Sequence, residues 1–178
     1  MRTASQPWTV KVRIDDVPQA GRRVVLTADE ATRSAVAREA GVAGIERLEA
    51  AFELTRAGRD GVRVTGDVSA TVRQSCIVTL EPIENRISEA VDVAFAPGSA
   101  DADDREPAEI AIGAPDPPEP LIGATVDLGA IATEFLILGI DPYPRKSDAV
   151  FEAPPMADAG SGPFDVLAPL KKPDRERP

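Results

Sequence analysis

Residues 62–73, VRVTGDVSATVR, alternate between apolar and polar side chains along their whole length. A period of two is typical of a strand with one face buried and the other in water. Gly66 falls on the apolar row, where a glycine marks a bulge or the close approach of another backbone. A long, half-buried strand is therefore predicted here.

The segments on either side predict partners for this strand. Before it, four apolar residues recur at period two and lead into a glycine-rich run at 57–61: Leu48, Ala50, Phe52 and Leu54. Two such segments around a turn predict a long antiparallel hairpin. After it, the pattern predicts a short apolar strand at 76–80, a turn at 81–85 and a last strand at 87–95.

The N-terminal part adds two short strands, at 9–14 and 22–26, and one helix. Thr27 and Glu30 have the spacing of a capping box, which predicts a helix from there to about Ala40, and Gly41 is a natural stop. The fold class expected is α+β, an antiparallel meander or hairpin sheet with a few short helices packed on it.

The second half of the chain differs in composition. Residues 97–120 hold six prolines, seven acids and one arginine, which predicts a disordered acidic insert. Asp127 is expected to cap a short apolar helix that ends at Gly139. Four parts are therefore expected: a sheet body at 1–96, the insert at 97–120, a helical segment packing back on the body at 121–152, and a flexible tail with a short apolar stripe at 153–178.

The net charge and the small number of cysteine and histidine residues exclude several classes of function. The net charge is −10, with one cysteine and no histidine. These counts exclude an internal disulfide, a cysteine–histidine zinc site and a nucleophile–histidine dyad. We expect no metal, no cofactor, no small-molecule substrate and no catalysis. No signal peptide or membrane-length apolar run is found, so a cytoplasmic protein without membrane contact is expected.

Three stretches combine into a pattern: residues 66–82 (GDVSATVRQSCIVTLEP), 126–139 (VDLGAIATEFLILG) and 162–171 (GPFDVLAPLK). Their order and spacing resemble the YceD family, the large ribosomal RNA subunit accumulation proteins, and especially its proteobacterial branch. Many members carry further cysteines close to the equivalent of Cys76, in a pattern that suggests a metal site. Because this chain has no second cysteine, metal binding is not carried over. The resemblance supplies no catalytic residue to carry over.

The resemblance implies a ribosome-biogenesis factor that promotes accumulation of 23S rRNA and of the large subunit. Its partner is then 23S rRNA or a large-subunit ribosomal protein. Two other functions remain open: a general acidic adaptor or chaperone, and a metal-dependent RNA-processing enzyme that uses carboxylates.

Seven residues are candidates for contact with a partner: Arg47, Arg63, Arg73, Cys76, Thr79, Glu81 and Pro82. The arginines are expected on the polar faces of neighbouring strands, where they bind phosphate or pair with nearby acids. Cys76 is expected to be a buried small side chain, the alternative being a redox or partner-contact thiol. Residues 79–82 form either a recognition turn or a plain hairpin turn.

Overall fold

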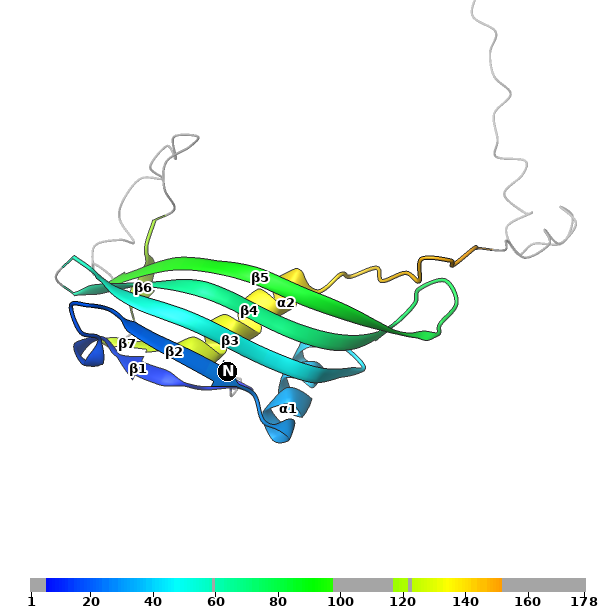
Figure 1. Ribbon diagram of the computed structural model, residues 1–178, viewed down its shortest axis with the longest axis horizontal. Coiled ribbons are helices and arrows are strands. Elements are labelled where there is room, and N and C mark those ends of the chain that lie inside the picture. The colour runs from blue at the N-terminus through cyan, green and yellow to red at the C-terminus, as the bar shows by residue number, and fades with distance from the viewer. Residues whose placement is uncertain (1–5, 59, 98–116, 122, 152–178) are drawn as a thin grey trace, which may run out of the picture.

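The structure is a computed structural model that describes residues 6–58, 60–97, 117–121 and 123–151 (Figure 1). Along the chain its elements are β1 (Lys11–Arg13), a 3-10 turn (Ile14–Asp16), β2 (Arg22–Thr27), α1 (Glu30–Ala40), β3 (Gly44–Ala57), β4 (Gly61–Ser75), β5 (Pro82–Pro97), β6 (Glu119–Leu121), β7 (Thr125–Asp127) and α2 (Leu128–Gly139). The expected α+β class, an antiparallel sheet with short helices packed on it, is confirmed.

The main sheet has five strands in the order β2-β3-β4-β5-β6. All neighbours are antiparallel except β6, which runs parallel to the end of β5. The predicted hairpin is the pair β3 and β4, and both strands alternate buried with accessible positions. We call the apolar side of this sheet the inner face and the polar side the outer face.

The helix α2 covers the inner face and completes the core. It lies across β4 and β5, as Figure 1 shows, and it buries Leu128, Ile131 and Leu136. Its start is the predicted one, because Asp127 Oδ1 accepts hydrogen bonds from the N–H groups of residues 129 and 130 at 3.1 and 3.3 Å. The same oxygen accepts from the Val10 N–H at 2.8 Å, which ties the helix to the N-terminal segment.

The predicted strand at 9–14 is shorter and lies outside the main sheet. β1 pairs antiparallel with β7, with Val12 opposite Val126, and residues 14–16 turn away as a 3-10 helix. The Ile14 N–H donates to the Ala124 carbonyl at 3.0 Å, which fixes this exit. The pairing joins segments that are far apart in the sequence, so local periodicity carries no sign of it.

The predicted N-cap of α1 is wrong by two residues. Thr27 is the last residue of β2 and pairs with Glu49. Asp29 is the N-cap, because its Oδ1 accepts from the Thr32 N–H at 2.8 Å. Threonine and aspartate both cap helices well, but Thr27 is already part of the sheet, so the helix begins after Asp29. The stop at Gly41, in the left-handed conformation, is confirmed.

Of the segment 97–120, Pro97 and residues 117–120 fall within the described residues, and Pro97 is the last residue of β5. Glu119 and Pro120 belong to β6, which pairs with Phe95–Pro97. Residues 98–116, and the tail with its apolar stripe at Phe164, Leu167 and Leu170, lie outside the described residues. Their mobility, like the division of the chain into four parts, stays a prediction. Neither described helix has the length and apolar character that a membrane crossing requires.

Candidate partner-binding surface

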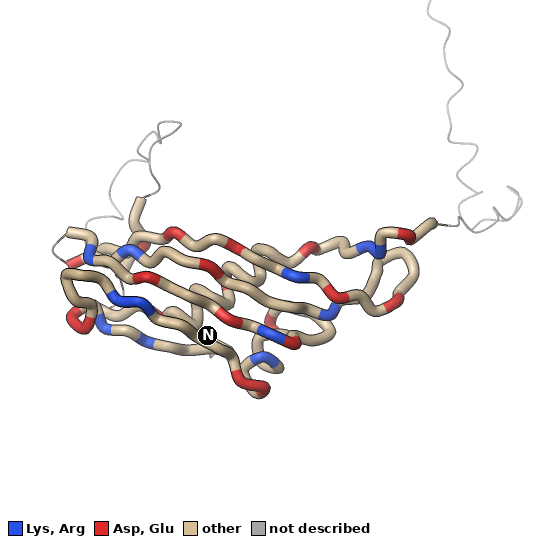
Figure 2. The backbone as a smooth tube through the Cα atoms, in the orientation of Figure 1, with Lys and Arg blue, Asp and Glu red and all other residues tan. Residues whose placement is uncertain are grey.

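The outer face of the main sheet carries charges of both signs. Figure 2 shows basic and acidic positions mixed along the long strands. Arg63 donates from Nε and Nη2 to the two carboxylate oxygens of Asp92, at 2.6 Å each. Arg47 Nε donates to Glu49 at 2.9 Å. These bonds lower the pKa of the Asp92 and Glu49 carboxyl groups, and both arginines are already matched by an anion.

The three candidate arginines do not form one patch. Arg47 lies opposite Thr71, close to Arg73 and to the β4–β5 turn. Arg73 Nε is itself 3.6 Å from a carboxylate oxygen of Glu46. Arg63 lies near the other end of β4, about 33 Å from Arg73 at the rise of an extended strand. Phosphate binding by these side chains stays a prediction.

The connection between β4 and β5 is a turn over residues 76–81, and the short strand predicted for 76–80 is wrong. The Cys76 N–H donates to the Glu81 carbonyl at 2.8 Å, and the Leu80 N–H donates to the Cys76 carbonyl at 2.9 Å. The turn predicted for 81–85 is also wrong, because Pro82 already begins β5. Alternating apolar residues are typical of a strand, but here the backbone N–H and carbonyl of Cys76 form the hydrogen bonds of a turn.

Cys76 lies beneath this turn and is fully buried, as expected. Its Sγ accepts from the backbone N–H groups of Lys146 at 3.4 Å, Thr79 at 3.5 Å and Val78 at 3.4 Å. These bonds, the one from Lys146 first, together with the side chain of Thr79, lower the pKa of the thiol from 9.0 to about 6. The cause is that N–H dipoles stabilise the thiolate.

The lowered pKa of Cys76 makes stability depend on pH. A group whose pKa is depressed by folding stabilises the fold fully above its unfolded pKa, and this contribution is lost as pH falls through its folded pKa. For Cys76 that window runs from about pH 9 down to about pH 6. The urea midpoint of the wild type, minus that of Cys76→Ser, is therefore expected to rise between pH 6 and pH 9. A difference that stays flat over this range would show that folding does not shift the thiol.

Lys146 is a residue of this region that the sequence did not reveal. Its Nζ donates to Glu81 Oε2 at 3.0 Å, and Thr79 Oγ1 donates to the same oxygen at 3.2 Å. The bond from Lys146 is the main cause of a lowered pKa at Glu81. The Ile77 N–H donates to the Pro144 carbonyl at 2.9 Å, so the segment after α2 runs beside the turn. No motif marks that segment.

The structure thus gathers four of the seven candidates in and beside the turn at one end of the sheet: Cys76, Thr79, Glu81 and Pro82. Arg47 and Arg73 lie on the strands near this end, and Arg63 lies near the other. Two exposed apolar side chains, Leu80 and Tyr143, lie on the two segments that meet there. Their contact with a partner stays a prediction. In the part of the chain that the structure describes, no group of three or more His, Cys, Asp or Glu residues is placed to hold a metal ion.

Comparison with known proteins adds one finding. Residues 64–170 match the family model described as "Large ribosomal RNA subunit accumulation protein YceD". The matched range covers more than half of the chain and includes most of β4, the turn at 76–81, β5 and α2. Searches of the curated proteins and of the solved structures give no significant match.

Proposed function

The chain belongs to the YceD family of large ribosomal RNA subunit accumulation proteins, and from this premise we propose that it acts by binding a basic protein of the large ribosomal subunit. In this role it is a stoichiometric, non-catalytic factor, and its binding promotes accumulation of 23S rRNA. The family match supports the biological role, and the charge of the chain supports the kind of partner.

The charges favour a basic protein over RNA as the direct partner. The net charge is −10 at pH 7, whereas binding to a nucleic-acid backbone is driven by cationic side chains that release counterions. On the outer face, Arg63 and Arg47 already bond to carboxylates. An RNA phosphate would have to break these ion pairs, while a cationic protein would meet complementary charge.

The side chains also support binding without catalysis. The chain has no histidine to act as a general base near neutral pH. Its only thiol, at Cys76, is buried and accepts three backbone hydrogen bonds. A reactive cysteine has to be accessible as well as ionised. Binding through a surface needs neither group.

Two measurements test this function. In cells that lack the gene, we expect the ratio of 23S to 16S rRNA to fall, and we expect expression of the chain to restore it. In vitro, the immobilised full-length protein is expected to retain purified large-subunit proteins at about 0.15 M salt. Under the same conditions it should retain protein-free 23S rRNA at least roughly tenfold more weakly, because the chain repels phosphate.

The two measurements separate the parts of the proposal. An unchanged rRNA ratio would contradict the role in accumulation. Retention of protein-free 23S rRNA without any large-subunit protein would show that RNA is the direct partner. A charge-matched acidic protein of unrelated fold is the control, since equal retention on it would mean that net charge alone is responsible.

A further inference from the structure

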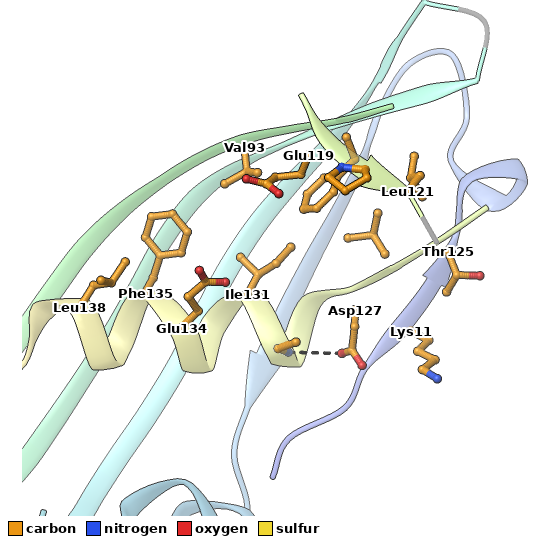
Figure 3. A pocket seen from close by; sticks show the side chains of 14 residues that line it. Lys11, Val93, Glu119, Leu121, Thr125, Asp127, Ile131, Glu134, Phe135 and Leu138 are labelled. Atoms are coloured by element: carbon orange, nitrogen blue, oxygen red, sulfur yellow. Dashed lines mark hydrogen bonds between the residues drawn. The ribbon is translucent and has the colours of Figure 1, made fainter. Parts of the chain in front are cut away.

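An apolar groove lies between the end of β5, the short strand β6 and the helix α2. Its volume is about 670 Å³, which is in the range of sites that hold several side chains or a small ligand. Figure 3 shows Val93, Ile131 and Phe135 pointing into it, with Leu138 at the far end of the helix wall. Leu138 is 72 % exposed, so the groove remains accessible along this wall.

The groove opens beside an unpaired strand edge. On the side away from β4, the strand β5 pairs with β6 over residues 95–97 alone, so within the described residues 82–94 have no strand on that side. β6 cannot extend this pairing towards its N-terminus, because Pro117 and Pro118 precede it and proline has no N–H to donate. A row of backbone donors and acceptors is therefore available to a further strand.

The described charges around the groove are mostly negative. Of the ionisable side chains that line it, one is basic, Lys11, and three are acidic: Glu119, Asp127 and Glu134. Asp127 is occupied by the backbone N–H groups that it caps. Glu119 and Glu134 are exposed, on β6 and α2 respectively, and they rim the apolar floor from two sides. A segment that binds here is favoured if it is cationic.

We propose that this groove and the edge of β5 bind an extended, cationic segment of a partner protein. The segment adds a strand to β5, and its alternate side chains serve two purposes. Aliphatic side chains on one face enter the groove against Phe135 and Leu138, and lysine or arginine side chains lie near Glu119 and Glu134. The inference rests on the proposed function, since it specifies how a basic ribosomal protein would be held.

The probe is a labelled twelve-residue peptide in which lysine and valine alternate, added to the full-length protein at about 0.15 M salt. Two control peptides isolate the features of the site. A block peptide with the same composition, six lysines followed by six valines, keeps the charge and loses the alternation, and we expect it to bind about tenfold more weakly. N-methylation of alternate backbone amides removes strand hydrogen bonds and is expected to weaken binding about a hundredfold.

Variants of the protein show where on its surface the peptide binds. Leu138→Asp is expected to weaken binding of the alternating peptide roughly tenfold, because it puts a charge on the apolar wall. Glu134→Lys is expected to weaken it about three- to tenfold. Glu53→Lys, on the outer face of β3, makes the same change in net charge away from the groove. It should change binding less than about twofold, since the Debye length at this salt is about 8 Å.

Other results either overturn the inference or separate it from the proposed function. Equal binding of the block or N-methylated peptide would mean non-specific attraction, and no binding would mean that the edge does not accept a strand. A dimer of the full-length protein that Leu138→Asp disperses would mean that a second copy occupies the edge.

If large-subunit proteins are retained and Leu138→Asp leaves their retention unchanged, the proposed function stands and this site is wrong. If they are not retained while the alternating peptide binds as expected, the site stands and its partner is another basic protein.

Discussion

Gly66→Ala is expected to lower the free energy of unfolding by at least about 3 kcal/mol. Gly66 has a φ of +148°, which residues with a side chain rarely adopt. A Cβ at this position would overlap the carbonyl oxygen of Ala51 and lie 3.0 Å from the Cα of Phe52. Both obstacles are backbone of the neighbouring β3, so no side-chain rotation relieves them. Native domains have only about 5–15 kcal/mol of stability in total.

Gly41→Ala is the matched control for this prediction. Gly41 also has a positive φ, +67°, but nothing lies within 4 Å of where its Cβ would be. Gly41→Ala should lower the free energy of unfolding by about 1 kcal/mol, which is the cost of the left-handed backbone alone. Urea unfolding followed by circular dichroism measures both. If Gly66→Ala is as stable as Gly41→Ala or more stable, the close approach of β3 and β4 at Gly66 is wrong. A Gly66→Ala protein that does not fold supports the close approach.

The position of Gly66 shows how far local patterns reach. A glycine on the apolar row predicted a bulge or a close backbone approach, and the structure confirms the close approach. The irregularity in the β3–β4 pairing lies elsewhere, between Ile45 and Arg47. The strands β3, β4 and β5 were predictable because each has one buried face and one face in water. Apolar and polar residues therefore alternate along them.

The features that the sequence did not predict depend on distant contacts. β1 pairs with β7, and β6 forms in a proline-rich segment because the end of β5 offers it an edge. The turn at 76–81 resembled a strand, since its apolar residues alternate while its hydrogen bonds involve Cys76 and Lys146. The candidate arginines were placed on the correct face, but their ion pairs depend on register, which alternation alone does not give.

The groove was missed for a related reason. The apolar residues of α2 read as one stripe in the sequence, and a stripe on a short helix is usually core. In the structure that stripe is divided. Leu128 and Leu136 are buried beneath the sheet, while Phe135 remains partly accessible and Leu138 is exposed. Only the position of β5 relative to the helix separates the two groups.

Leu136→Ala is expected to lower the free energy of unfolding by about 2–5 kcal/mol. Leu136 is completely buried in the core between α2 and the main sheet, so truncation removes its contacts and leaves a cavity that the neighbouring strands cannot easily fill. The expected change is large enough to lower the urea midpoint clearly and to be seen by circular dichroism.

Leu138→Ala is the control on the same helix, and it connects stability with binding. Leu138 is 72 % exposed, and alanine favours a helix at least as well as leucine, so the change in stability should stay within about 0.5 kcal/mol. The same substitution removes apolar surface from the groove and should weaken the alternating lysine–valine peptide. A loss of stability similar to that of Leu136→Ala would mean that Leu138 is buried in the native protein. The groove would then not be open along α2, and the strand-addition site would lose its apolar wall.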